Sequence, residues 1–289
     1  MLPLTGKTSV YGIFGDPVAH SLSPVMQNAA FAHYRIDAVY VPFHVHAGNL
    51  DEAVSSLRAL NINGINVTIP HKEAILPLLD EVDPDATRIG AVNTVVNRNG
   101  HLVGYNTDSS GFLRSARGEL GFKPEDQHAL LLGAGGACRA AVYALLAAGI
   151  GQVTIANRNL DRACKLVAAM SVNQKSHKLV PVTYGTPAFL QALSRADLIV
   201  NTTSVGLRGE KLKFLPLENI KGSALIYDMV YSEAGTALTK AAATHGLASV
   251  DGLSLLAAQG EDAFYLWTNE RLPSGFMRRF LTDYQSTGK

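Results

Sequence analysis

A glycine-rich stretch near the middle of the sequence has the composition of a phosphate-binding turn. The apolar run Ala129–Leu132 leads directly into Gly133–Arg139, and an alanine-rich stretch typical of a helix follows. A buried strand, a tight glycine turn and a helix N-terminus form a cradle for a pyrophosphate, because backbone N–H groups and the helix dipole favour negative charge there. The third position of the GxGxxG pattern is Cys138, which is small but is not glycine. The order of strand, turn and helix favours dinucleotide binding over a purely structural turn.

The residues that follow the next apolar run indicate which dinucleotide would be bound. NAD-binding proteins usually place an acidic side chain there, which bonds the ribose 2′-hydroxyl. This sequence instead has Asn157 and Arg158, with Arg162 one helical turn later. Two guanidinium groups suit a 2′-phosphate, because each presents a planar fork of donors. The pattern favours NADP, and the alternative is a solvated helix start with surface arginines.

Polar residues at the end of an earlier apolar run point to proton transfer. Strand alternation puts Asn66 and Thr68 on one face, at the carboxyl end of a strand, where α/β proteins bind ligands. Lys72 is expected in the first turn of the following helix, where the helix dipole disfavours a cation. That field would favour the neutral amine, which a lysine needs if it is to exchange protons near neutral pH. The alternative is a surface lysine whose stem lies along the protein.

Asp108 is a carboxylate that could complete this site. It opens a predicted helix, so it could equally be no more than the N-cap of that helix. A carboxylate beside Lys72 would hold the ammonium in place and tune its protonation. The two residues are far apart in the sequence, so only the fold can bring them together.

Two serines near the N-terminus are candidates for binding a carboxylate. Ser23 and Pro24 have the pattern of an N-cap followed by proline at the first helical position. Ser21 is not explained in this way. Because two hydroxyls beside a helix N-terminus can bind an anion, the stretch 20–24 is a candidate ligand site, and a plain helix cap is the alternative.

The elements that must position these residues alternate between strand and helix. The predicted strands are Ser9–Gly15, Ala38–Val45, Gly64–Ile69, His128–Gly133, Gln152–Asn157, Lys178–Tyr184, Leu198–Asn201 and Ala224–Asp228. The predicted helices between them include Pro24–Tyr34, Leu50–Leu60, Ala137–Ala148 and Leu160–Met170. This alternation predicts an α/β protein of βαβ units with mostly parallel sheets. Ala91–Val96 and His101–Tyr105 read as a hairpin that turns at Asn99-Gly100.

The same reading predicts two domains. A helix over Ser109–Leu120 precedes a new βαβ series that starts at His128, so the first domain boundary is placed near Asp108. The last segment, Leu253–Tyr284, reads as two helices without a strand of their own. It must therefore pack on a sheet formed elsewhere in the chain.

Length and composition fit a folded protein with a small ligand. The 289 residues suffice for two modest domains, and 47% hydrophobic with 17% charged residues is typical of a well-packed globular chain. Net charge is +1, from 25 basic and 24 acidic residues, which argues against a broad interface with nucleic acid or an anionic membrane. Two cysteines without a CxxC or a Cys/His cluster predict neither a disulfide framework nor a zinc site, and no metal is expected. We expect a cytoplasmic protein, because neither a signal peptide nor a membrane span is evident.

Eight motifs in order along the chain resemble the shikimate dehydrogenase family, which includes shikimate/quinate dehydrogenases. They cover nearly the whole chain: His20–Pro24, Asn66–Lys72, Gly90–Thr94, Tyr105–Asp108, Gly133–Arg139, Asn157–Arg162, Asn201–Gly206 and Asp251–Gln259. The resemblance implies an N-terminal α/β substrate domain with a mostly parallel sheet, a Rossmann-type NADP-binding domain, and a cleft between them. It implies a substrate-binding and catalytic domain over 1–108, completed by the C-terminal helices 253–289, and an NADP-binding domain over 109–252.

The resemblance also implies a role for individual residues. Lys72 and Asp108 would form the catalytic pair. Substrate would be bound by Asp108 together with Ser21, Ser23, Asn66, Thr68, Asn93, Tyr231 and Gln259. NADP would be bound by Gly133, Ala134, Gly135, Gly136, Ala137, Asn157, Arg158, Arg162, Thr202, Ser204 and Gly252. Ser254-Leu255 departs from the family, which often has Gly-Met near the nicotinamide.

The activity implied is the reversible, NADP-dependent reduction of 3-dehydroshikimate to shikimate, a step towards chorismate and the aromatic amino acids. We expect a small-molecule substrate, no nucleic-acid or membrane partner, and a monomer or homodimer. Three alternatives stay open: an enzyme that accepts quinate as well, a non-catalytic ligand sensor, and a folate-type dehydrogenase. The Ser-Leu-Ser-Pro start disfavours the last of these, and intact Lys72 and Asp108 count against the sensor.

Overall fold

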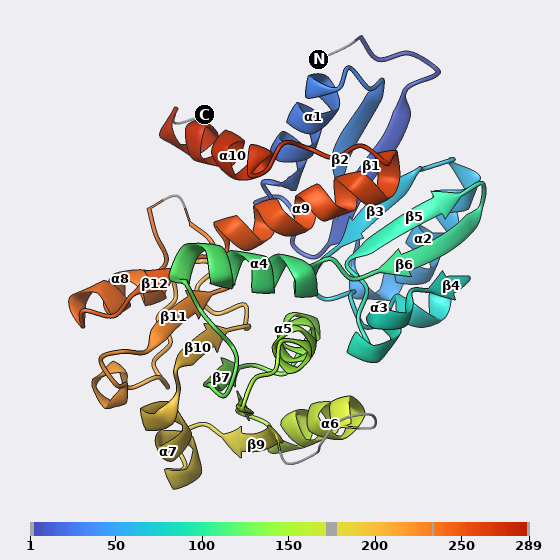
Figure 1. Ribbon diagram of the computed structural model, residues 1–289. Helices are drawn as coiled ribbons and strands as arrows, with labels where there is room; N and C mark the ends of the chain where they lie inside the picture. The colour runs from blue at the N-terminus through green and yellow to red at the C-terminus, as the bar shows by residue number, and fades with distance from the viewer. Residues whose placement is uncertain (1–2, 172–177, 233, 288–289) are drawn as a thin grey trace. The chain divides into compact units, whose positions relative to one another are not determined.

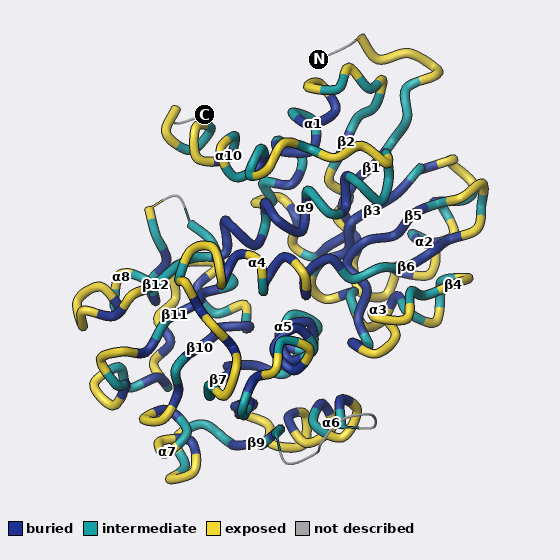
Figure 2. The backbone as a smooth tube through the Cα atoms, viewed as in Figure 1, coloured by how far each residue is buried: buried dark blue, intermediate teal, exposed yellow. Residues whose placement is uncertain are grey.

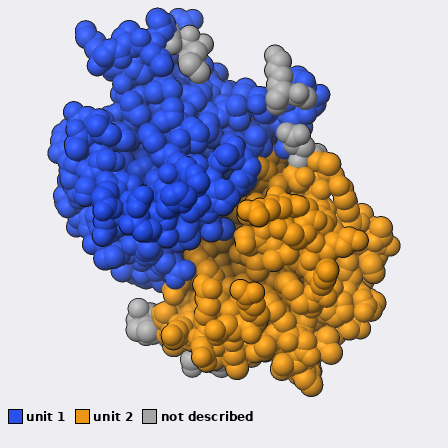
Figure 3. Space-filling view, turned by 180° about the vertical axis from the view of Figure 1, so that it is seen from behind, with its two compact units in different colours: residues 1–111, 256–289 blue, residues 112–255 orange. Residues whose placement is uncertain are grey.

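The computed structural model describes residues 3–171, 178–232 and 234–287. The chain divides into two compact units (Figure 3): unit 1 comprises residues 1–111 and 256–289, and unit 2 comprises residues 112–255. Residues 1–2 and 288–289, which the sequence assigned to the substrate-binding domain, lie outside the described part. The N-terminal and C-terminal segments therefore form one compact unit, and the segment between them forms the other.

Unit 1 contains a six-stranded sheet. Its strands are β1 (Ser9–Gly15), β2 (Ala38–His44), β3 (Gly64–Val67), β4 (Glu81–Val82), β5 (Thr94–Arg98) and β6 (His101–Tyr105). Their order is β2-β1-β3-β5-β6-β4, in which β5 runs antiparallel to β3 and β6, and the other pairs are parallel. Asn99 and Gly100 have φ values of 54° and 93°, the positive values that a two-residue hairpin turn requires, so the predicted hairpin is confirmed.

Helices cover this sheet, and Trp267 of the C-terminal segment packs against it. The helices with residues in unit 1 are α1 (Ser23–His33), α2 (Leu50–Ala59), α3 (Pro84–Ile89), α4 (Asp108–Leu120), α9 (Leu253–Thr268) and α10 (Phe276–Ser286), with short 3₁₀ turns at Ala47–Asn49 and Leu76–Leu78. α10 lies beside α1 (Figure 1), which joins the two ends of the chain. On α9, the indole of Trp267 donates to Val95 O at 3.0 Å and packs 5.2 Å from the ring of Tyr11. The C-terminal segment thus packs on the first sheet.

Unit 2 is a doubly wound α/β unit. Its strands are β7 (His128–Leu132), β8 (Gln152–Asn157), β9 (Leu179–Thr183), β10 (Leu198–Asn201), β11 (Leu225–Asp228) and β12 (Ser249–Val250). They are all parallel, in the order β12-β11-β10-β7-β8-β9. The strand order reverses between β7 and β10, and ligands of such sheets bind outside the carboxyl ends of the strands at that point.

The core of unit 2 surrounds the strand and helix that flank the glycine turn. The helices of this unit are α5 (Gly136–Ala147), α6 (Leu160–Ser171), α7 (Pro187–Arg195) and α8 (Ala237–Thr244), with a 3₁₀ turn at Leu217–Asn219. Figure 2 shows β7 and α5 mostly buried, and Leu130, Leu131 and Leu132 are fully excluded from solvent. The two-sheet α/β fold predicted from the sequence is confirmed.

Most of the predicted strands and helices agree with the structure to within two residues, although the strand expected over Ala91–Val96 begins three residues later, as β5. β3 ends at Val67 instead of Ile69, and the chain continues in turns over residues 72–75. Within residues 3–171, 178–232 and 234–287, no helix combines the length and hydropathy that a membrane crossing requires.

Candidate active site

Lys72 and Asp108 meet in unit 1, as the sequence predicted a catalytic pair must. The ammonium Nζ of Lys72 donates to Oδ2 of Asp108 at 2.5 Å, and the side chains are only 16% and 10% exposed. An ion pair that is largely removed from water is held more firmly than a surface pair, because its partners are screened less. Within the described part of the chain, Lys72 Nζ donates one hydrogen bond to Asp108. An ammonium group carries three hydrogens, so two further donors exist on the same nitrogen. The pair is therefore able to hold a proton donor at a substrate oxygen.

The backbone around Lys72 is a turn anchored at both ends, and our expectation of a helix there is wrong. His71 N–H donates to Thr68 O at 2.9 Å, and Val92 N–H donates to Lys72 O at 2.8 Å. The ring of His71 is buried, and its Nε2 lies 2.6 Å from Val45 O, so this side chain attaches the turn to the residue that follows β2. The helix dipole that we expected to act on Lys72 therefore does not arise from residues 72–75.

The alternative in which Asp108 merely caps a helix is also wrong. α4 begins at Asp108, but the side chain of Asn106 makes the cap: its Oδ1 accepts from the N–H groups of Asp108 at 3.1 Å and Ser109 at 3.2 Å. The carboxylate of Asp108 is thereby left to Lys72 and to Asn93. Asn106 was not among the predicted residues, although an Asx residue two positions before a helix is a recognisable capping signal.

Asn93 is the centre of the polar network that positions Asp108. Its Nδ2 donates to Asp108 Oδ1 and to Thr107 Oγ1, both at 2.9 Å, and lies 3.4 Å from Gln259 Oε1. Its Oδ1 accepts from Thr107 N–H at 2.7 Å. Asn93 is only 2% exposed and Gln259 7%, so the network is shielded from water and each broken bond would leave a buried polar group unpaired. It joins Asn93, just before β5, to Thr107, which follows β6, and to residues of α4 and α9.

A second set of polar side chains continues this network towards α1. Asn66 Nδ2 donates to Asn93 O and to Thr94 Oγ1, both at 3.1 Å, and Asn66 Oδ1 accepts from Tyr40 OH at 2.8 Å. Burial raises the pKa of the Tyr40 phenol well above its usual value, and a hydrogen bond with Ser23 opposes that shift. The structure therefore links Ser23, Asn66, Asn93 and Asp108. Tyr40 and Thr94 were not predicted, because Tyr40 lies in an apolar strand and Thr94 is a single β-branched residue in a hairpin.

The structure contradicts the helix-cap role that the sequence suggested for Ser23. Ser23 is the first residue of α1 and does not cap it; instead Ser21 Oγ accepts from Ser23 N–H at 3.2 Å. Ser23 is buried and Ser21 is partly exposed. Thr68 follows β3, donates its N–H to Phe14 O at 2.9 Å, and has no recorded bond to the network around Asn93 within the described residues. Binding of a substrate by Ser21, Ser23 and Thr68 stays a prediction.

The glycine turn of unit 2 has the backbone of a phosphate cradle. Gly133 has a φ of 113°, and a Cβ there would lie 2.8 Å from Thr202 Oγ1, so only glycine suits this position. Gly135 precedes α5 without a side-chain cap, and a Cβ at Gly135 would meet no atom within 4 Å. The N-cap of α5 therefore has no side chain, and the space where one would lie is open. A pyrophosphate fits these features.

The residues expected to select NADP lie at the end of β8. Asn157 is the last residue of that strand, and its Nδ2 donates to Asn159 O at 2.9 Å. Asn159 Oδ1 accepts from Arg162 N–H at 3.2 Å, so Asn159 caps α6. Arg158 and Arg162 are exposed. Both guanidinium groups can therefore reach a dissolved phosphate, and their role stays a prediction.

The loops after β10 and β11 are held together by a buried carboxylate. Asp228 Oδ1 accepts from Asn201 Nδ2 at 2.8 Å and from Val230 N–H at 3.1 Å, and Asp228 is fully buried. Asn201 Oδ1 in turn accepts from Thr203 N–H at 3.1 Å. Thr202 Oγ1 donates to Leu132 O at 2.7 Å, which ties the same loop to the end of β7. The loops that carry Thr202 and Tyr231 are thus fixed at the carboxyl edge of the sheet.

The remaining predicted residues lie near this edge of unit 2. Ser204 is exposed on the loop after β10, and Tyr231 is half-buried after β11. Gly252 is required where it stands, because a Cβ there would lie 2.2 Å from Met229 O. Ser254, the departure from the family pattern, is buried and donates to Glu119 Oε1 at 2.5 Å, so its hydroxyl joins α9 to α4.

The stability of the protein should depend on the charge of Asp228. Burial raises the pKa of Asp228 to about 6 from its ordinary value of 3.8. Its carboxyl group therefore ionises in the unfolded chain at a lower pH than in the folded chain, so stability is lost as the pH rises from about 4 to 6. The loss from this group is about 3 kcal/mol in total, at ~1.4 kcal/mol per pKa unit. Denaturant unfolding across this range should show that Asp228→Asn removes this part of the slope.

Asp80→Asn is the matched control for this experiment. Hydrogen bonds from Leu102 N–H and Arg58 hold the pKa of Asp80 below its usual range, so its contribution has the opposite sign and is lost as the pH falls. A wild-type slope in Asp228→Asn would contradict the assignment of a raised pKa to this carboxyl group.

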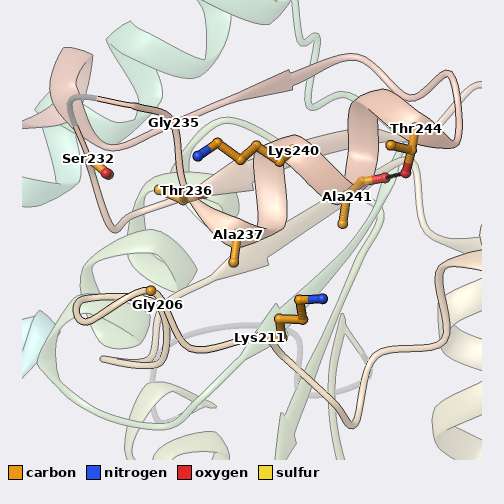
Figure 4. Close-up of a pocket in the computed structure, with 10 residues that line it drawn as sticks. Gly206, Lys211, Ser232, Gly235, Thr236, Ala237, Lys240, Ala241 and Thr244 are labelled. Carbon is orange, nitrogen blue, oxygen red and sulfur yellow. Dashed lines mark hydrogen bonds between the residues drawn. The ribbon is translucent and has the colours of Figure 1, made fainter.

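A hollow of about 570 Å³ lies beside the loops after β10 and β11 in unit 2. It is lined by Gly206, Gly209, Lys211, Ser232, Gly235, Thr236, Ala237, Lys240, Ala241 and Thr244. Figure 4 shows that its walls are α8 and the loop around Gly206. None of these lining residues is a predicted catalytic, substrate-binding or cofactor-binding residue, although Ser232 follows the predicted Tyr231 directly.

A doubly wound sheet with a glycine turn at its switch point, together with a buried lysine–aspartate pair in an α/β unit, defines a class of protein: the dinucleotide-dependent oxidoreductases with two α/β units. Residues 13–95 match the family model described as the shikimate dehydrogenase substrate binding domain. Residues 115–230 match the family model described as shikimate / quinate 5-dehydrogenase. The chain belongs to the shikimate dehydrogenase family.

Individual relatives match over almost the full length. The curated shikimate dehydrogenase (NADP(+)) of Geobacter sp. (strain M21) is 48% identical over 280 residues, which cover 97% of each chain. The crystal structure of shikimate dehydrogenase from Aquifex aeolicus has 39% identity and a TM-score of 0.87, and the match covers 96% of this chain and 99% of that one. The Thermus thermophilus enzyme, solved with NADP(H) and shikimate, has 35% identity and a TM-score of 0.82, covering 96% of this chain and 100% of that one.

Proposed function

We propose that this protein is an NADP-dependent shikimate dehydrogenase that interconverts 3-dehydroshikimate and shikimate. The observation that carries the proposal is the largely buried pair of Lys72 and Asp108, which provides a proton donor. The curated relatives of the chain are named for this reaction. The proposed place of the reaction is the cytoplasm, in a protein that is a monomer or a homodimer.

Lys72 is the group that exchanges the proton. Reduction of the ring ketone produces an alkoxide, which needs a proton, and an ammonium 2.5 Å from a carboxylate is a charged donor held in a fixed direction. In the reverse direction the neutral amine of Lys72 accepts the proton of the shikimate hydroxyl. When bound, NADP(H) supplies or accepts the hydride at the same ring carbon.

Asp108 orients the lysine by accepting a hydrogen bond from its ammonium group. The carboxylate is itself held by Asn93, so two buried side chains fix the position of the ammonium. Fixed groups of this kind contribute to the rate because they need no reorganisation during the reaction.

The proposed substrate contacts are polar side chains of unit 1 and one tyrosine of unit 2. Ser21 and Ser23 are proposed to bind the substrate carboxylate. The ring hydroxyls are proposed to contact Asn66, Thr68, Asn93, Asp108 and Gln259, and Tyr231 is proposed to reach the substrate from unit 2. The supporting observation is that Ser23, Asn66, Asn93 and Gln259 belong to one connected polar network that ends at Asp108. Unit 1 would then be the substrate-binding domain.

The residues proposed to hold NADP lie in unit 2. The pyrophosphate is proposed to contact the backbone of residues 133–137, and the adenosine phosphate to contact Asn157, Arg158 and Arg162. Thr202, Ser204 and Gly252 are proposed to bind the remainder of the dinucleotide. The open space at Gly135 and the exposed arginines support this assignment.

Initial rates test the proposal directly. Purified protein would be assayed with shikimate and with quinate, each against NADP and NAD. We expect shikimate with NADP to give the highest kcat/KM of the four combinations. A preference for quinate would favour the other acid named in the second family description, and no NADP-dependent oxidation of shikimate would favour a ligand sensor.

A further inference from the structure

Three side chains at the carboxyl ends of β1 and β2 form a cluster that the proposed reaction does not use. Nε2 of His44 lies 2.6 Å from Asp16 Oδ1, and Nδ1 of His46 lies 3.0 Å from Asp16 Oδ2. One ligand atom from each of the three residues lies within 4.8 Å of the other two. Two imidazole nitrogens and a carboxylate are therefore already gathered around one point.

The backbone of the two strands holds this cluster in place. β1 and β2 run side by side (Figure 1), with Gly15 paired to His44, so Asp16 emerges next to the end of β2. Val45 N–H donates to Gly15 O at 3.1 Å, and Asp16 N–H donates to Ile69 O at 2.9 Å. The three ligands are thus fixed by strand pairing, which lowers the cost of gathering them around an ion.

The chemistry of the cluster is that of a metal site with open positions. The side chains of His44, His46 and Asp16 are 52%, 66% and 33% exposed, so water can complete the coordination. Neutral imidazole with carboxylate and water is a common ligand set for Zn²⁺.

We propose that Asp16, His44 and His46 bind one Zn²⁺ ion per chain. The ion would take the place of the two hydrogen bonds that now join the histidines to the carboxylate. The ion would connect Asp16 to the end of β2. Asp16 is the first residue of the loop that leads from β1 to Ser21. The Cys/His patterns by which zinc sites are recognised in sequences do not include this arrangement, because Asp16 is brought to the two histidines only by strand pairing.

Zinc titration of the metal-free protein tests this site. Calorimetry would be carried out in a Cys164→Ser background, because that thiol is exposed and could bind zinc itself. We expect one ion per chain, a rise of a few degrees in Tm at saturating zinc, and at least a tenfold loss of affinity in His44→Ala and in His46→Ala. Without zinc, both variants should oxidise shikimate at the wild-type rate, which shows that they are folded.

His101→Ala is the matched control. His101 is exposed, and its Nε2 lies 3.3 Å from Glu81 Oε2. It therefore also pairs with a carboxylate, but that pair involves one histidine instead of two. We expect this variant to bind zinc as the parent does. The proposal is overturned if the parent binds no zinc, if His44→Ala and His46→Ala keep the parental affinity, or if His101→Ala loses as much affinity as they do.

Discussion

Replacing Lys72 with alanine should lower kcat for shikimate oxidation by about 10²- to 10⁴-fold, the usual contribution of a positioned proton donor or acceptor. The KM for shikimate should change by less than about fivefold, because the proposed carboxylate and hydroxyl ligands stay in place and lost interactions of the transition state appear in kcat. Steady-state rates with saturating NADP would measure both constants.

Lys72→Arg separates proton transfer from simple charge. Arginine keeps a cation that can pair with Asp108, but it does not release its proton near neutral pH. The arginine variant should therefore stay as slow as the alanine variant. Lys7→Ala, which removes an exposed lysine of unit 1, is the control and should have wild-type activity. Turnover near the wild-type value in Lys72→Ala would remove lysine from the mechanism.

Removing the two arginines after β8 should change the choice of cofactor. Charge-assisted hydrogen bonds to a phosphate are worth about 1.5–3 kcal/mol when formed in full, and exposure reduces this value for Arg158 and Arg162. We expect the KM for NADP to rise about tenfold in each single alanine variant and about 100-fold in the double variant. The KM for NAD, which has no 2′-phosphate, should stay within about twofold.

The effect of salt and a surface control complete this test. The KM of the wild type for NADP should rise with ionic strength, and the double variant should lose most of that dependence. Arg195→Ala, at the exposed end of α7, should leave both cofactors unaffected. Equal losses with NADP and NAD would contradict the assignment of these arginines to the 2′-phosphate.

The parts of the fold that rest on local patterns were predictable from the sequence. Apolar runs of strand length alternating with helical patterns identified the six-residue β8 and the glycine turn after β7, because burial of an all-parallel sheet leaves near-continuous apolar strands. Asn99-Gly100 identified the hairpin because both positions need a positive φ. Position at the carboxyl end of a strand was enough to single out Asn66, whereas Lys72 was singled out by an expected helix that the structure does not have.

The errors arose where the local conformation depends on distant contacts. Lys72 lies in a turn that is held by the N–H group of Val92 and by the buried ring of His71. The sequence next to Lys72 does not indicate either contact, because the partners Val92 and Val45 are distant along the chain. Asn106 caps α4 in place of Asp108 because its side chain reaches two N–H groups, a choice between two good capping residues that propensity does not decide. Tyr40 enters the polar network through its hydroxyl although its ring belongs to the core.

The central claim is that Lys72 and Asp108 act as one unit, and a double-mutant cycle on kcat tests it most directly. Lys72→Ala, Asp108→Asn and the double variant would be compared with the wild type at saturating shikimate and NADP. The structure predicts that each single change is severe and that the double variant is hardly slower than the slower single variant, since either change disables the same ion pair. Losses that multiply, or an Asp108→Asn variant with wild-type turnover, would show that the two groups act independently and would contradict the account.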